Sequence, residues 1–130
     1  MTISSERWQA LSEAAWAVQQ RARLVGDTKV GAAVLADNDT IYVGCNVEHK
    51  FRAHDVHAEV NALTNMIAAG GTRAIAVLIV SNRERFTPCG GCLDWIFELG
   101  GEDTLVAFEP RPGAKRETYR ADQLMPFYPR

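Results

Sequence analysis

The chain has 130 residues, a length typical of one compact domain, and we expect a single domain over residues 1–130. Hydrophobic residues make up 47% of it, which argues against a disordered chain. The formal net charge is −2 with no run of Lys or Arg, which argues against long nucleic acid as a partner. No apolar run approaches the roughly 20 residues of a membrane span, and the polar N-terminus lacks a signal-peptide core. We therefore expect a cytoplasmic protein without membrane contact.

The first expected element is a helix that Ser4 or Ser5 caps and that runs to about Val25, where Gly26 ends it. Its apolar residues recur at spacings of three and four, which predicts one buried stripe. They are Trp8, Leu11, Ala15, Val18, Ala22 and Val25.

Two strands are expected next, over residues 30–35 and 41–47, joined by a polar turn. The continuous apolar run 74–80 is typical of a central strand buried on both faces, and residues 104–108 form another strand.

Helices are expected over residues 57–69 and from Cys89 or Gly90 to Leu99, and the tail is expected to add a last strand and a short helix. This alternation predicts an α/β fold, a three-layer α/β/α sandwich around a mixed five-stranded sheet.

Two short motifs carry the chemistry: His57-Ala58-Glu59 and Pro88-Cys89-Gly90-Gly91-Cys92. They supply one imidazole and two thiols, enough for a Zn²⁺ ion with three protein ligands and one open position. His57 and the Cys89–Cys92 segment each open an expected helix, and two helix N-termini facing one point favour the thiolate form that binds metal. Since three cysteines with a Cys-x-x-Cys pair fit metal or redox use better than a disulfide scaffold, we predict that His57, Cys89 and Cys92 bind zinc.

Glu59 lies two residues after the histidine ligand, where a single carboxylate can act first as general base and then as general acid. This arrangement suits the hydrolysis of an amidine-like carbon, such as C4 of cytosine, with release of ammonia. We predict Glu59 as the catalytic residue.

Other readings of these motifs remain open. A structural zinc would need a fourth ligand from Cys45, His49 or His54. A thioredoxin-like use of the two cysteines leaves His57 and Glu59 without a role. A zinc-stabilised binding protein without turnover is the alternative outside the enzymes.

The chain resembles the small homotetrameric cytidine deaminases, a family that includes the blasticidin-S deaminases. The His-x-Glu and Pro-Cys-x-x-Cys pattern is the mark of zinc-dependent nucleobase deaminases. Four further segments resemble this family over most of the chain: Val30–Val34, Gly44–Glu48, Thr87–Cys92 and Leu124–Phe127.

The resemblance implies roles for further residues. Asn46 and Glu48 would hold ribose hydroxyls, Ala58 would contact the base edge through its backbone, and Thr28 stands where the family has an aromatic near the pyrimidine. Phe127 corresponds to a tail aromatic that reaches a neighbouring subunit's pocket, which implies a homotetramer.

The departures from the family concern the substrate. His57 replaces the usual cysteine, Leu93 replaces an arginine, and the loop His49–Asp55 is charged where the family is small and neutral. This loop indicates either an altered substrate or a subunit contact. We expect deamination of a cytosine-type nucleoside in pyrimidine salvage, with a free base, another aminated heterocycle or a blasticidin-S-like antibiotic as the alternative substrates.

Overall fold

The computed structural model describes residues 2–86 and 88–129, so Thr87 of the segment Thr87–Cys92 lies outside the described residues. Within this part of the chain, no helix has the length and apolar character needed to cross a bilayer. The elements are α1 (Ser5–Gln19), β1 (Val30–Ala36), β2 (Ile41–Cys45), the 3-10 turn η1 (Arg52–His54), α2 (Ala58–Ala68), β3 (Ala74–Ser81), α3 (Gly90–Gly100), β4 (Leu105–Glu109), β5 (Glu117–Arg120) and α4 (Ala121–Leu124).

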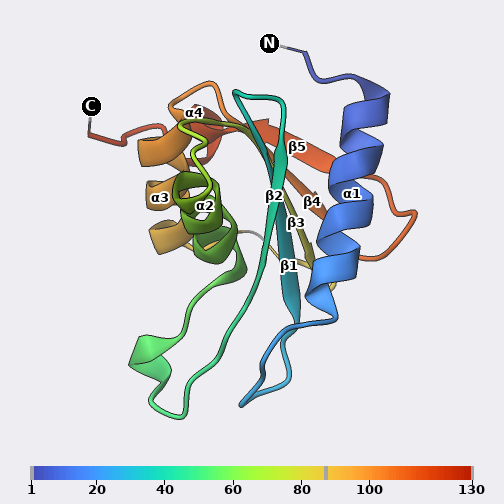
Figure 1. The fold of residues 1–130 in the computed structure, drawn as a ribbon, viewed down its shortest axis with the longest axis vertical. Coiled ribbons are helices and arrows are strands. Elements are labelled where there is room, and N and C mark those ends of the chain that lie inside the picture. The colour runs from blue at the N-terminus through green and yellow to red at the C-terminus, as the bar shows by residue number, and fades with distance from the viewer. Residues whose placement is uncertain (1, 87, 130) are drawn as a thin grey trace.

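The five strands form one mixed sheet in the order β2-β1-β3-β4-β5. β3 and β4 are parallel, and the other neighbouring strands are antiparallel. Helix α1 covers one face of the sheet, and α2 and α3 cover the other (Figure 1). The predicted α/β/α sandwich around a mixed five-stranded sheet is therefore confirmed.

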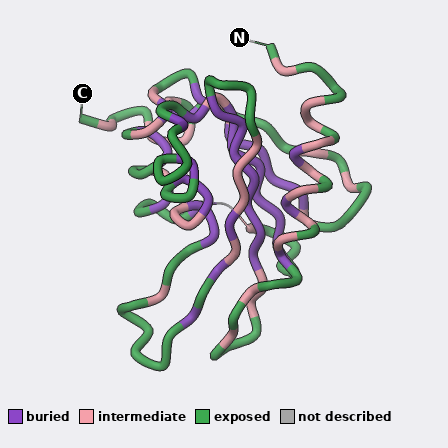
Figure 2. The backbone as a smooth tube through the Cα atoms, in the orientation of Figure 1, coloured by how far each residue is buried: buried purple, intermediate pink, exposed green. Residues whose placement is uncertain are grey.

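The core has two halves, one on each face of the sheet. Side chains of β1 and β3 point alternately to the two faces, as the pleat of a strand requires. Val34 and Ile79 pack with Ala62 and Leu63 of α2, whereas Leu35 and Leu78 lie in the cluster beneath α1. Both strands are buried along most of their length (Figure 2), as the apolar run 74–80 predicted.

Helix α1 is shorter than predicted. Ser4 caps it, with its hydroxyl accepting a hydrogen bond from the Arg7 amide at 3.1 Å, but the helix ends at Gln19 rather than near Val25. Beyond it, the Arg23 amide donates to the Asn46 carbonyl at 3.0 Å, and the Glu48 amide donates to the Arg23 carbonyl at 2.8 Å. These tertiary hydrogen bonds occupy groups that a longer helix would need, and Val25 is 52% exposed.

The second strand also ends earlier than predicted, at Cys45 instead of Val47. Val47 instead forms isolated bridges with Arg23 and with Val56. These bridges connect the segment after β2, where it leaves the sheet, both with the segment that follows α1 and with the end of the loop before α2.

A buried carboxylate joins α1 to the end of β4. Glu109 is 3% exposed and accepts hydrogen bonds from the Ser12 hydroxyl at 2.7 Å, the Trp16 indole at 2.9 Å and Arg116 Nε at 3.1 Å. All three donors reach it on the α1 side of the sheet, away from the predicted zinc ligands.

Replacing Arg116 with Ala is expected to lower the free energy of unfolding by about 2 kcal/mol, because it leaves the buried Glu109 charge without its cation. Arg111→Ala is the matched control, since Arg111 pairs with Glu84 on the surface and such pairs contribute about 0–1 kcal/mol. Urea denaturation measures both. Equal decreases in the free energy of unfolding for the two variants would show that Arg116 is not needed to stabilise the buried Glu109 carboxylate.

Candidate functional site

Two helix N-termini meet at the predicted metal site. His57 is the N-cap of α2, and Cys89 is the N-cap of α3, both in extended backbone conformations. The Cys92 amide, in the first turn of α3, donates to the Cys89 sulfur at 3.5 Å. The local structure therefore places an imidazole and two thiols at the positive ends of two helix dipoles.

The three predicted ligand atoms form a nearly regular triangle. His57 Nδ1 lies 3.2 Å from Cys92 Sγ and 3.5 Å from Cys89 Sγ, and the two sulfurs are 3.5 Å apart. Zn–S bonds of about 2.3 Å and Zn–N bonds of about 2.0 Å place tetrahedral ligand atoms about 3.5–3.8 Å from one another. The donor set and its spacing fit a Zn²⁺ ion.

Among the residues that the structure describes, this triad is the one group of His, Cys, Asp or Glu side chains close enough to hold a metal ion. The candidates for a fourth ligand, Cys45, His49 and His54, do not belong to it. The geometry thus favours three protein ligands with an open position over a closed structural site.

Glu59 adjoins the triad from the first turn of α2. Its side chain is 1% exposed, and within the described chain Oε2 has no hydrogen-bond partner. Burial raises the pKa of the Glu59 carboxyl. Burial, together with the neighbouring Glu59 carboxylate, also raises the pKa of the Cys92 thiol. A divalent cation at the triad would oppose both shifts, because it favours the charged forms of the carboxyl and the thiol.

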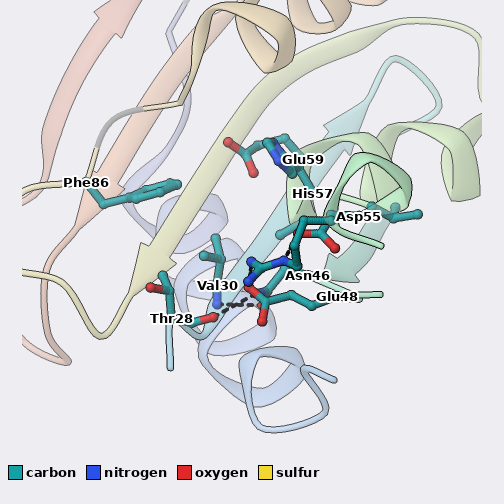
Figure 3. A pocket seen from close by; sticks show the side chains of 11 residues that line it. Thr28, Val30, Asn46, Glu48, Asp55, His57, Glu59 and Phe86 are labelled. Carbon is teal, nitrogen blue, oxygen red and sulfur yellow. Dashed lines mark hydrogen bonds and ion pairs between the residues drawn. The ribbon is translucent and has the colours of Figure 1, made fainter. Parts of the chain in front are cut away.

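A cavity of about 230 Å³ opens beside Glu59 and His57 (Figure 3). Its wall combines the start of α2, the start of β1 and the loop that follows β2. The lining residues are Thr28, Val30, Asn46, Glu48, Arg52, Asp55, Val56, His57, Ala58, Glu59 and Phe86. Glu59, Asn46, Glu48, Ala58 and Thr28, which the sequence singled out, therefore share one cavity.

Asn46 and Glu48 line the cavity, but their side chains also form hydrogen bonds within the protein. Asn46 accepts from the Val30 amide at 2.9 Å and donates to the Thr28 carbonyl at 2.7 Å (Figure 3). Glu48 Oε1 accepts from the amides of Val25 and Gly26, each at 2.8 Å. Both side chains thus also fix the segment that leads into β1, a structural role that the sequence did not indicate.

Phe127 does not line the cavity of its own chain. It lies after α4 and is 95% exposed. The structure therefore separates it from the other predicted site residues.

The sequence did not predict five residues of the cavity wall as site residues: Val30, Arg52, Asp55, Val56 and Phe86. Phe86, which precedes the Pro88–Cys92 motif, lies across the cavity from Glu48 and Asp55 (Figure 3). Arg52 and Asp55 belong to the charged loop, whose sequence indicates a substrate or subunit contact but not which of its side chains reach the cavity. An aromatic residue close to a zinc motif was the available signal for Phe86; nothing in the sequence distinguished Arg52 from Lys50.

Replacing Cys92 with Ser is expected to reduce bound zinc from one ion per chain to well below half after dialysis, because a serine hydroxyl is a far weaker zinc ligand than a thiolate. Cys45→Ser is the matched control and should retain the metal. Elemental analysis of the purified proteins measures both. Zinc lost from Cys45→Ser and kept by Cys92→Ser would contradict the ligand assignment.

The chain was also compared with known proteins. The family model described as the cytidine and deoxycytidylate deaminase zinc-binding region matches residues 5–108. A cytidine deaminase of Sporosarcina psychrophila is 37% identical over 96 residues, which cover 73% of this chain and 71% of that protein. A cytidine deaminase of Mycobacterium tuberculosis is 33% identical over 84 residues, 64% of this chain but only 63% of that protein's length.

Solved structures agree with this assignment. The cytidine deaminase of Burkholderia pseudomallei superposes with a TM-score of 0.86 at 29% identity, covering 96% of this chain and 98% of that chain. The matched segment 5–108 includes the triad, Glu59 and all of the residues that line the cavity. The chain belongs to the cytidine and deoxycytidylate deaminase zinc-binding family.

Proposed function

We propose that the chain catalyses the zinc-dependent hydrolytic deamination of a cytosine-type nucleoside to the uridine-type product and ammonia. The observation that carries the proposal is the Glu59 carboxylate. It is buried beside the His57, Cys89 and Cys92 donors, its Oε2 has no partner in the described chain, and it forms part of the cavity wall. A buried polar atom without a partner is costly unless a ligand or a reaction uses it.

The three ligands would hold zinc through His57 Nδ1 and the sulfurs of Cys89 and Cys92. A zinc ion with three protein ligands supplies, when bound, an open position at which water becomes acidic enough to act as a nucleophile. Glu59 would take one proton from the attacking water and pass it to the ring nitrogen. It would then take the second proton from the hydroxyl group that the attack leaves on the ring carbon, as this group becomes the carbonyl, and deliver it to the departing amine. One water is thus consumed and one ammonia is released.

The cavity wall supports a nucleoside as the substrate. Phe86 offers an aromatic face for a base, and Ala58 offers backbone groups beside Glu59 for the base edge. Asn46 and Glu48 retain unused hydrogen-bonding capacity for sugar hydroxyls. Thr28 lines the cavity where a larger side chain would narrow it.

The proposal extends to the assembly. Phe127 is almost fully exposed and absent from its own cavity, which supports a homotetramer in which it reaches a neighbour's site. Cytoplasmic pyrimidine salvage is the corresponding physiological role. Analytical ultracentrifugation of the wild type and of Phe127→Ala tests the assembly, and a monomer that releases ammonia at the full rate would contradict it.

The test of the reaction is ammonia release by the zinc-loaded protein from cytidine, deoxycytidine, cytosine, adenosine and blasticidin S. We expect cytidine or deoxycytidine to give the highest kcat/KM. Higher turnover of cytosine or blasticidin S would replace the nucleoside assignment and keep the chemistry. No ammonia from any of the five compounds would contradict the proposal.

A further inference from the structure

Arg52 occupies an unusual place for a surface arginine. It lies in η1, at the tip of the charged loop, yet its side chain lines the same cavity as Glu59. Nη2 donates to Glu48 Oε2 at 2.9 Å, and Nε donates to Asp55 Oδ2 at 2.8 Å. The guanidinium thus bridges two carboxylates whose side chains are only 8% and 12% exposed.

The bridge belongs to a longer chain of contacts. Glu48 Oε1 holds the amides of Val25 and Gly26, and Asp55 Oδ1 accepts from the His49 amide at 2.7 Å. A Cβ at Gly26 would lie 3.6 Å from Arg52 Nη1 and 3.7 Å from Glu48 Oε1. Arg52 therefore connects the segment before β1 with the segment that leads into His57.

The hydrogen-bonding capacity of this pair can be counted. An ionised carboxylate accepts about four hydrogen bonds, and three of those of Glu48 are taken, so about one acceptor position remains on Oε2. A guanidinium has five N–H donors. Within the described chain, two of those of Arg52 are in use, and both donors of Nη1 remain. The cavity wall thus offers an acceptor and several donors side by side.

We propose that Arg52 is a specificity-determining residue that, together with Glu48, recognises the hydroxyl groups of a nucleoside sugar by hydrogen bonding. A hydroxyl both donates and accepts, so two neighbouring hydroxyls match an adjacent carboxylate and guanidinium. A phosphate fits this place poorly, because Glu48 and Asp55 already give the three-residue cluster a net negative charge. The inference rests on the proposed function and deepens it, since it predicts a preference for a nucleoside over a free base.

The test measures binding of reaction products, which needs no turnover. Isothermal titration calorimetry on the zinc-loaded wild type, Arg52→Gln and Arg52→Lys would use uridine, uracil and uridine 5′-phosphate as ligands. Lys50→Gln is the matched control, because Lys50 is on the same loop, stacks over Phe51 and does not line the cavity.

We expect Arg52→Gln to weaken uridine binding about ten- to a hundredfold, the usual effect of losing hydrogen bonds to a charged group, and to leave uracil binding within about twofold. Arg52→Lys should recover part of the loss, and Lys50→Gln should bind like the wild type. In turnover, KM for cytidine should rise in Arg52→Gln more than kcat falls. If Arg52→Gln does not fold, Arg52→Lys serves instead, with a several-fold loss for uridine alone.

Five results would overturn the inference. Equal weakening of uridine and uracil would make Arg52 a general support of the loop. Unchanged uridine binding in Arg52→Gln would show that Arg52 does not recognise the sugar, and it would not contradict the proposed deamination. A wild-type preference for uridine 5′-phosphate that Arg52→Gln abolishes would assign the guanidinium to a phosphate. A wild type that binds uridine and uracil equally would also exclude sugar reading, and absence of all binding would count against the proposed function as well.

Discussion

Replacing Glu59 with Gln is expected to lower kcat for ammonia release about 10²- to 10⁴-fold, the usual contribution of a positioned general acid–base group. Gln has nearly the same shape as Glu but cannot take up and return a proton. The buried side chain would then carry no charge, so the free energy of unfolding should stay the same or rise. Ammonia release, zinc content and urea denaturation measured on one preparation would separate these effects.

Glu98→Gln is the matched control, because Glu98 is an exposed residue of α3 outside the cavity. It should leave kcat unchanged. A non-catalytic zinc-binding protein predicts that Glu59→Gln has no more effect than Glu98→Gln. Loss of zinc together with activity in Glu59→Gln would contradict a purely proton-transferring role.

Replacing Gly44 with Ala is expected to destabilise the protein by about 3 kcal/mol or more and to reduce zinc retention. A Cβ at Gly44 would lie 2.3 Å from the Ala62 amide nitrogen and 2.7 Å from the Ala58 carbonyl oxygen, both in the backbone of α2. The helix therefore lies directly on β2. Pushing it away would displace His57 and Glu59, which stand at its N-terminus.

Gly90→Ala is the control for this substitution. Among the described residues, a Cβ at Gly90 would meet no atom within 4 Å outside its own helix backbone. We expect Gly90→Ala to keep its zinc and its stability. Urea denaturation and zinc analysis of both variants test the argument; a fully stable Gly44→Ala would show that α2 can move without cost.

The parts of the fold that follow from local patterns could be predicted from the sequence. The apolar run 74–80 became β3, and the polar turn after residue 35 joined β1 to β2. Helix α1 was overextended because Ala22 and Val25 continue the apolar period. The spacing of apolar residues gives no information about the tertiary hydrogen bonds of Arg23 with Asn46 and Glu48, which prevent the helix from continuing.

In the site, too, the features that depend on local sequence patterns could be predicted, and those that depend on tertiary contacts could not. His57, Cys89 and Cys92 are neighbours within two short motifs at helix N-termini, so spacing along the sequence was enough to predict their meeting. Arg52 and Phe86 reach the cavity from loops, where side-chain direction depends on contacts far away in the sequence. The hydrogen bonds that Asn46 and Glu48 form within the protein could not be predicted either, because their partners Val30, Val25 and Gly26 lie 16 to 23 residues earlier in the sequence.

The most direct test of the central claim is a zinc titration of the metal-free protein with cytidine present, following bound zinc, ammonia and uridine together. We predict that the initial rate of ammonia release rises in proportion to bound zinc, saturates at one ion per chain and yields one uridine for each ammonia. A full rate in the metal-free protein would contradict the account. So would a protein with one bound zinc that releases no ammonia.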